Sequence, residues 1–268
     1  MKFNTVGVKE NPVIIMCNGS FTTGESLISF AEKLSDSYYV ILPTYDGHTD
    51  DGTVFTTRTE QARKIFQYLQ SEGIQEVELV QGLSMGAEVA LDLAAMMYQS
   101  GNITLKHGMF DGGPFFHFNP LMRKIMQKKF LNLLNGLKGL NEEEAFEKVT
   151  KNPMIKWMMK GQDLSAYKGM IGGMSWISPC LTDESIRNES DACYTFDFPE
   201  VDEEEQKKYL FMWSDNEPAH SSEKSIRKHY PHAQYRSNGN LGHGGFFIKQ
   251  PEEYEKLIRE VTAQPKVE

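Results

Sequence analysis

Ser84 lies in a context that can turn a serine hydroxyl into a nucleophile. The G-x-S-x-G motif at residues 82–86 follows a short run of strand-forming residues at 77–81 and precedes apolar residues at helical spacing from Ala87 onward. Between a strand and a helix, this motif forms a sharp turn that lifts the serine hydroxyl out of the sheet. The stretch therefore predicts nucleophilic catalysis by Ser84.

Three neighbours of Ser84 have steric or electrostatic roles in this turn. A Cβ atom at Gly82 or Gly86 would collide with neighbouring elements in so tight a turn. Unfavourable backbone angles at Ser84 are tolerated where the fold imposes them. The amide of Met85 lies at the N-terminus of the following helix, where free donors and the helix dipole favour a developing oxyanion. We therefore expect Met85 to supply one donor of an oxyanion hole.

Two further stretches carry groups that could work with such a serine. The turn at 214–218, which includes Asp215 and Glu217, follows an apolar run at 209–213, and His243 lies in a glycine-rich loop after a short strand at 233–236. Ligands and catalysts gather beyond the carboxyl ends of parallel strands, so both should reach the same edge as Ser84. A neutral imidazole can take the serine proton, and a carboxylate on its far nitrogen fixes the tautomer and stabilises the imidazolium.

The elements that must position these groups alternate between strands and helices. The apolar runs at 12–17 and 38–43 are typical of strands covered on both faces. A further strand is expected at 104–110, and residues 1–9 are a weaker candidate. Helices are expected at about 27–34, 58–71, 87–100, 221–230 and 251–261. The alternation predicts an α/β fold with a mostly parallel, doubly wound sheet.

The pattern changes between residues 114 and 205, where helical stretches dominate, at 121–137, 142–150 and 153–159, followed by a Gly-Met segment at 168–176. We interpret 114–205 as a helical lid inserted into a core domain formed by 1–113 and 206–268. Residues 264–268 are expected to form a loose tail. One group of lid side chains could either line an adaptable acyl pocket or pack within the lid: Met154, Met158, Met159, Met170 and Met174.

The elbow, the order nucleophile–acid–base and the helical insertion resemble the α/β-hydrolase superfamily over nearly the whole chain. The resemblance is closest to small lidded serine esterases and acyl-hydrolases, and the motifs at 82–86, 214–218 and 241–244 carry it. It implies an α/β-hydrolase fold and a catalytic triad that includes Ser84 and His243. Family members usually have a Gly-x-x-Asp turn where this chain has Ser-Asp-Asn-Glu; that register selects Glu217 as the acid, with Asp215 as its competitor.

The resemblance also implies a second oxyanion donor on the loop after the first long strand, where the family often has His-Gly-x. This chain has Asn18 in place of the histidine, which leaves the backbone role intact. The amide of Ser20 is the expected donor and that of Phe21 the next; Phe21 is also an expected substrate-binding residue. The turn at 46–48, Asp-Gly-His, resembles a turn common in the family, and we expect it to be structural.

The composition and net charge of the chain argue against several other classes of protein. The chain has 268 residues, enough for one large domain or a domain with an insertion. A net charge of −9, with no Lys/Arg stripe, argues against nucleic-acid binding. Three scattered cysteines show neither metal-ligand nor disulfide spacing, so no metal, cofactor or disulfide frame is expected. The N-terminal residues lack a signal pattern and no apolar run could span a membrane, so we expect a cytoplasmic protein without a membrane partner.

These observations favour a cofactor-independent serine hydrolase that acts on a small-molecule ester or thioester through an acyl-enzyme. Two alternatives stay open. One is a receptor or signalling module that keeps the fold and triad to bind a small molecule, since fold alone does not fix function. The other is a non-hydrolytic relative, such as an acyltransferase or perhydrolase.

Overall fold

A mostly parallel sheet forms the centre of the computed structural model, which describes residues 1–159 and 162–263. The side chain of Met158 and the expected tail at 264–268 lie outside the described residues. Within them the strand order is β1-β3-β2-β4-β5-β6-β7. Only the pair of β1 with β3 is antiparallel in this part of the chain. The strands are β1 (Lys2–Val6), β2 (Val13–Cys17), β3 (Tyr39–Thr44), β4 (Glu76–Leu83), β5 (Thr104–Asp111), β6 (Tyr209–Trp213) and β7 (Gln234–Ser237).

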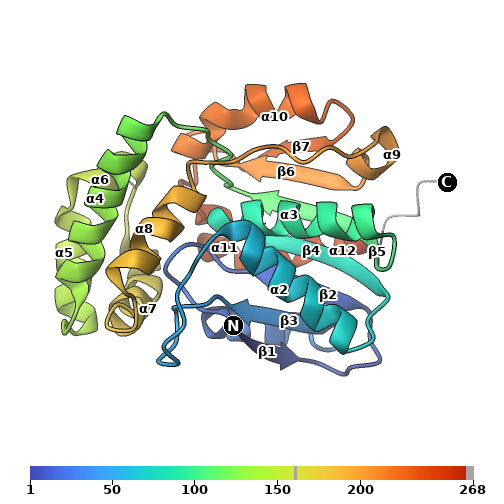
Figure 1. Cartoon of the computed structure of the whole chain (residues 1–268), viewed down its shortest axis with the longest axis horizontal. Coiled ribbons are helices and arrows are strands. Elements are labelled where there is room, and N and C mark those ends of the chain that lie inside the picture. Colours follow the sequence, from blue (N-terminus) through green and yellow to red (C-terminus); the bar gives the residue numbers. More distant parts are fainter. Residues whose placement is uncertain (160–161, 264–268) are drawn as a thin grey trace.

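Helices cover both faces of the sheet, because alternate residues of each buried strand point to opposite sides. In β2, Ile15 packs in the core that holds α2 (Arg58–Ser71) and α3 (Met85–Ser100). Its neighbour Ile14 packs in the core that holds α1 (Ile28–Ala31) and α12 (Pro251–Thr262). Figure 1 shows α2 and α3 in front of the sheet and α12 behind it. The predicted doubly wound α/β arrangement is confirmed.

The shorter helices follow the sequence less closely. The helix expected at 27–34 is split, because 3₁₀ turns at Gly24–Leu27 and Glu32–Leu34 flank the single α-helical turn of α1. The helix expected at 221–230 begins as a 3₁₀ turn at Pro218–Ser222, directly after Glu217. Three further short helices belong to the C-terminal part of the fold: α9 (Glu203–Gln206), α10 (Glu223–His229) and α11 (Gly245–Lys249).

The segment between β5 and β6 contains a layer of helices beyond the carboxyl ends of the parallel strands, at the left of Figure 1. No helix within the described ranges has both the length and the apolar character needed to cross a membrane. The layer comprises α4 (Pro120–Leu137), α5 (Glu142–Lys151), α6 (Pro153–Met159), α7 (Lys168–Ile177) and α8 (Asp183–Ala192). We call these the inserted helices.

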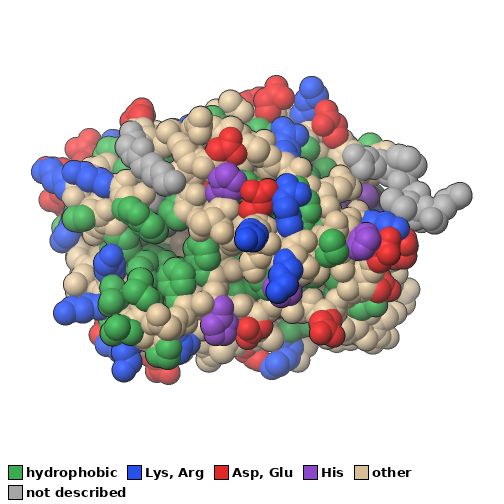
Figure 2. Space-filling model, turned by 90° about the horizontal axis from the view of Figure 1, so that it is seen from above, with side chains coloured by type: hydrophobic (Ala, Val, Ile, Leu, Met, Phe, Trp, Pro, Cys, Tyr) green, Lys and Arg blue, Asp and Glu red, His purple; other side chains and the backbone are tan. Residues whose placement is uncertain are grey.

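Large exposed hydrophobic side chains gather on the inserted helices. Figure 2 shows hydrophobic side chains around a hollow on the side of the molecule where this layer lies. Three of the methionines considered above, Met154, Met159 and Met174, are buried in the core, which favours packing for them, whereas Met170 is exposed. The exposed set on these helices is Leu121, Met122, Ile125, Trp157, Met170 and Trp176. Such surfaces are typical of binding sites.

Polar bonds fix α8 to the core. The backbone amide of Phe55 donates to Ser185 Oγ at 3.1 Å, and Asn188 Nδ2 donates to the Phe55 carbonyl at 3.0 Å. At the other end of the helix, Arg58 Nη1 donates to the carbonyl of Thr195 at 3.1 Å. The contacts span more than a hundred residues of sequence, so the position of α8 is set by tertiary structure.

Candidate active site

The elbow between β4 and α3 has the strained geometry that the motif predicts. Ser84 has φ 56° and ψ −126°, a conformation that costs a non-glycine residue about 1–3 kcal/mol. A Cβ on Gly82 would lie 2.1 Å from the Gly86 carbonyl oxygen, and a Cβ on Gly86 would lie 2.3 Å from that of Cys17. The Ser84 amide donates to the Asp111 carbonyl at 2.8 Å, which ties the elbow to the end of β5. Neighbouring backbone therefore imposes the strained turn at Ser84.

Ser84, His243 and Glu217 form a hydrogen-bonded relay. His243 Nε2 lies 2.9 Å from Ser84 Oγ, and His243 Nδ1 lies 2.5 Å from Glu217 Oε2. An ionised carboxylate only accepts hydrogen bonds, so Nδ1 carries the proton and Nε2 is free to accept from the serine hydroxyl. The three loops that the sequence predicted to converge do meet at one edge of the sheet.

The geometry joins Glu217, and not Asp215, to the imidazole. The Glu217 side chain is buried, and its second oxygen, Oε1, accepts from the Ser214 amide at 2.6 Å. Asp215 is exposed, and its Oδ1 accepts from Ser237 Oγ at 2.6 Å. A carboxylate held at both oxygens has a fixed orientation, which is what a residue that orients a histidine requires.

The loop that carries His243 is held on two sides. From the acid turn, Ser214 Oγ donates to the Gly242 carbonyl at 2.8 Å and Asn216 Oδ1 accepts from the Gly242 amide at 2.9 Å. From the inserted segment, Tyr167 OH donates to the His243 carbonyl at 3.0 Å. Gly242 has φ 80°, a left-handed conformation that glycine adopts without strain. The imidazole is thus positioned by the core and by the insertion together.

The electrostatics of the relay involve a third acidic residue, Asp111, at the end of β5. Burial of the His243 ring lowers its pKa, but the hydrogen bond and charge of Glu217 outweigh this and leave the pKa above its usual 6.5. Burial, followed by the negative charge of Glu217, raises the pKa of Asp111 to about 8. Asp111 therefore keeps its proton more readily than an exposed aspartate does.

The amides of Met85 and Ser20 are available beside the nucleophile. Met85 is the first residue of α3, and the Ser20 loop touches the elbow, since a Cβ on Gly19 would lie 3.5 Å from Ser84 Cβ. Within the described residues neither amide donates a hydrogen bond. The amide of Phe21, by contrast, donates to Glu189 Oε1 at 2.7 Å. The arrangement can therefore offer an oxyanion the amides of Met85 and Ser20, but not that of Phe21.

The candidate site is reachable from the surface, although parts of it are buried. Ser84 and His243 are partly exposed, whereas Met85 and Glu217 are buried. The ring of Phe21 is only 1% exposed and packs against Phe130 of α4, with ring centroids 5.3 Å apart. In this conformation Phe21 offers a ligand almost no surface, and its role as a substrate-binding residue remains a prediction.

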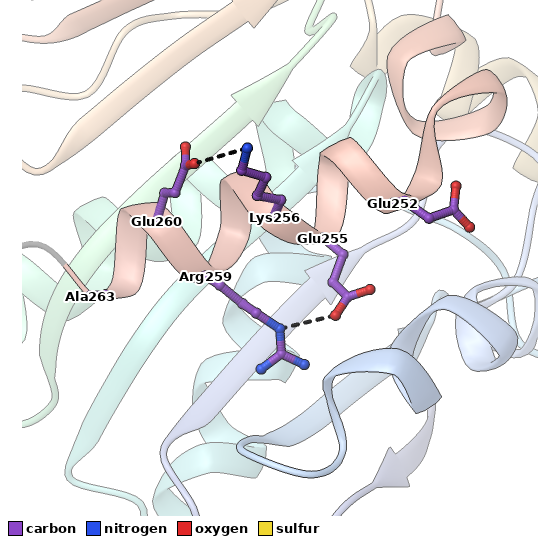
Figure 3. A pocket seen from close by; sticks show the side chains of 6 residues that line it. All are labelled: Glu252, Glu255, Lys256, Arg259, Glu260 and Ala263. Atoms are coloured by element: carbon purple, nitrogen blue, oxygen red, sulfur yellow. Dashed lines mark hydrogen bonds and ion pairs between the residues drawn. The ribbon is translucent and has the colours of Figure 1, made fainter.

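A second hollow lies on the outside of α12 (Figure 3). Its charged side chains pair with one another: Arg259 Nε lies 3.0 Å from Glu255 Oε1, and Lys256 Nζ lies 3.9 Å from Glu260 Oε1. Its lining has no serine, cysteine or histidine. The hollow on α12 therefore has no group suited to nucleophilic catalysis. Nor do the described residues contain a cluster of three His, Cys, Asp or Glu side chains that could hold a metal ion.

Sequence reasoning missed one residue near the site. Glu189 of α8 contacts the loop after β2 and also His48, whose Nε2 lies 2.8 Å from Glu189 Oε2. No helix was predicted at 183–192, although Thr182 followed by two acidic residues is a typical helix start. The side chain of Thr182 accepts from the Ser185 amide at 3.0 Å, as an N-cap does.

No protein-family model matches the chain, and no curated protein sequence matches it. Solved structures do match it along nearly its whole length. An α/β hydrolase family protein from Desulfitobacterium hafniense superposes with a TM-score of 0.73 at 21% identity, covering 97% of this chain and 99% of its own.

Two carboxylesterases are also similar in structure. The one from Nitrososphaera gargenis has a TM-score of 0.72 at 15% identity, covering 98% of this chain and 93% of its own. Carboxylesterase CesB from Bacillus subtilis has a TM-score of 0.62 at 14% identity, covering 97% of this chain and 87% of its own. The chain has the α/β-hydrolase fold, as its sequence motifs predicted.

Proposed function

We propose that the protein is a serine hydrolase that cleaves a carboxylic ester or thioester through an acyl-enzyme. The observation that carries the proposal is the relay from Ser84 Oγ to His243 Nε2, at 2.9 Å, and from Nδ1 to the buried Glu217 carboxylate, at 2.5 Å. A hydroxyl, an imidazole and a carboxylate in this order are the working parts of acyl transfer. The likeness to carboxylesterases of the same fold supports the choice of an ester substrate.

The first half of the reaction forms the acyl-enzyme. Ser84 Oγ attacks the carbonyl carbon while His243 Nε2 takes the hydroxyl proton, and Glu217 stabilises the resulting imidazolium. The carbonyl oxygen becomes an oxyanion that accepts hydrogen bonds from the Met85 and Ser20 amides. When the tetrahedral intermediate collapses, His243 returns its proton to the departing alcohol or thiol, and the acyl group stays on Ser84.

The second half repeats these steps with water as the nucleophile. His243 takes a proton from water, the hydroxide attacks the acyl carbon, and a second oxyanion forms at the same two amides. Collapse releases the acid and returns the proton to Ser84 Oγ. No cofactor enters either half, because every proton moves between substrate, water, Ser84 and His243.

We further propose a cytoplasmic location, which follows from the expectation drawn from the sequence alone.

The proposal is tested by the variant Ser84→Ala, assayed for steady-state hydrolysis of p-nitrophenyl acetate and butyrate. Loss of the nucleophile should lower kcat by at least about 10³-fold, leaving only what binding and the oxyanion amides supply. The matched control is Ser71→Ala, at the exposed end of α2, which should keep wild-type turnover. Undiminished turnover in Ser84→Ala would refute the proposal. A wild-type protein that releases one equivalent of p-nitrophenol and then stops would instead support the receptor alternative.

A further inference from the structure

A buried carboxylate on the inserted helix α8 holds the loop that carries the Ser20 amide. Glu189 Oε1 accepts from the Phe21 amide at 2.7 Å, and Oε2 lies 2.8 Å from His48 Nε2. The side chains of Glu189 and His48 are both 0% exposed. The other ring nitrogen, His48 Nδ1, lies 2.8 Å from the carbonyl oxygen of Thr22. Glu189 and His48 thus hold two consecutive residues of the loop, one at its N–H and one at its C=O.

The hydrogen-bond pattern fixes how many protons the Glu189–His48 pair holds. A carbonyl oxygen only accepts, so His48 Nδ1 donates to Thr22. One proton is therefore shared between His48 Nε2 and Glu189 Oε2, either on the ring or on the carboxyl group, and in both cases the pair is neutral. A neutral pair matters because an unpaired carboxylate beside an oxyanion site would disfavour the charge that the reaction develops.

The loop needs such support because its conformation is strained. Phe21 has φ 55°, a left-handed conformation that is strained for a bulky residue and persists only where its surroundings impose it. Within the loop, Asn18 Nδ2 donates to the Thr22 carbonyl at 2.7 Å. Glu189, on α8, supplies the acceptor for the Phe21 amide. Removing that acceptor leaves a buried N–H unpaired and frees the loop to relax.

We propose that Glu189 is a positioning residue for the oxyanion hole. By binding the Phe21 amide, it holds the preceding peptide so that the Ser20 amide faces the oxygen that develops at Ser84. Because Glu189 belongs to α8, the correct packing of the inserted helices becomes a condition for a complete oxyanion hole. This inference rests on the proposed function, since it concerns the reaction in which Ser20 and Met85 stabilise an oxyanion.

The test compares three substitutions that separate length from charge. Glu189→Gln keeps the length: its amide oxygen can accept from Phe21 and its NH₂ can donate to a neutral His48 Nε2. Glu189→Asp keeps the charge but withdraws the carboxylate by one methylene, and Glu189→Ala removes the acceptor. Positioning predicts that Gln retains kcat within about fivefold, whereas Asp loses about tenfold or more and Ala loses about 10²–10³-fold, the usual effect of one lost oxyanion donor.

The control is Glu184→Ala, an exposed acidic residue on the same helix, which should keep wild-type kcat and KM. KM for p-nitrophenyl butyrate should change less than threefold in all variants. Affinity for a trifluoromethyl ketone, which forms a tetrahedral oxyanion on the serine, should fall in parallel with kcat. A purely structural role for Glu189 would lower the fraction of folded protein and leave these ratios per folded molecule unchanged.

The results for the Glu189 variants can be told apart from a failure of the hydrolase proposal. If Ser84→Ala is inactive while Glu189→Ala or Glu189→Asp keeps wild-type kcat, the positioning role is overturned and the hydrolase proposal stands. If Asp retains more activity than Gln, the residue acts through its charge and the inference is wrong. If Glu189→Ala does not fold, the order of Gln above Asp still decides the matter, because both variants retain a polar side chain. If Ser84→Ala remains active, both proposals fall.

Discussion

The substitution Glu217→Gln should nearly abolish activity, because the structure leaves the glutamine only one useful orientation. Glu217 Oε1 accepts from the Ser214 amide at 2.6 Å, so that position requires an oxygen. The amide nitrogen of glutamine is then placed where Oε2 now lies, 2.5 Å from His243 Nδ1. An N–H at this position demands an unprotonated Nδ1, so the ring proton moves to Nε2. In that tautomer, the nitrogen facing Ser84 Oγ can no longer accept its proton.

The magnitude follows from the loss of the general base. Reversing the tautomer in a Ser-His-Asp triad costs about 10⁴ in kcat, equivalent to about 5.5 kcal/mol of transition-state stabilisation. The expected effect of Glu217→Gln is therefore a 10³–10⁴-fold lower kcat with a similar KM. Asp215→Asn is the matched control, because that carboxylate is exposed and bonded to Ser237; it should change kcat less than about threefold.

The assay is initial-rate hydrolysis of p-nitrophenyl butyrate at pH 8, after circular dichroism has shown that both variants are folded. A Glu217→Gln variant that keeps more than a tenth of wild-type kcat would contradict the role given to the Glu217 carboxylate. So would a larger loss of kcat in Asp215→Asn than in Glu217→Gln.

Three further outcomes are expected. The acid limb of the kcat/KM–pH profile should have an apparent pKa above 6.5, because the neutral imidazole is the active form and the pKa of His243 is raised; a limb below 6 would contradict this. Gly86→Ala should lower the melting temperature by roughly 6 °C or more, since its Cβ would lie 2.3 Å from the Cys17 carbonyl oxygen, whereas Gly169→Ala, with open space around it, should be neutral or slightly stabilising. Asp111 has its pKa raised to about 8, so the folded state binds the extra proton and the wild type should lose stability as pH rises from about 4 to 8. Asp111→Asn should therefore gain in melting temperature relative to the wild type across that range, and a constant difference would argue against the raised pKa.

Much of the core could be predicted because its local signals agree with its packing. Helix α2 begins and ends where the apolar spacing indicated, and Thr57 caps it by accepting from the Glu60 amide. The buried strands read as continuous apolar runs because both faces of the sheet are covered. The elbow was predictable because the G-x-S-x-G motif marks the turn by itself. A Cβ on Gly82 would meet Gly86 within the motif, whereas a Cβ on Gly86 would meet Cys17, far along the chain.

The insertion was less predictable because one of its buried faces is polar. Helix α8 buries Ser185, Glu189 and Ser190 together with Ile186 and Ala192, so apolar periodicity gives almost no signal. These polar groups find partners far along the chain, such as the Phe21 amide, 168 residues from Glu189. Pairings at such separations depend on the completed fold and leave no local mark in the sequence.

In the candidate site, too, the features with a local sequence signal were predicted, and those that depend on distant contacts were not. The alignment of residues 214–217 with the Gly-x-x-Asp turn of the family selected Glu217 over Asp215. In the structure, Glu217 is hydrogen-bonded to His243. The second oxyanion donor was expected at Ser20 or Phe21, and only the fold shows that the Phe21 amide is already bound. The catalytic roles of these residues remain predictions.

The most direct test of the account is labelling with a fluorophosphonate, read by intact-mass and peptide mass spectrometry. The relay predicts one adduct per molecule, located on Ser84, because only a serine with a hydrogen-bonded base attacks such a probe rapidly. Labelling should vanish in Ser84→Ala and slow by at least about 10³-fold in His243→Ala. An unlabelled wild-type protein, or equal labelling rates with and without the imidazole of His243, would contradict the central claim.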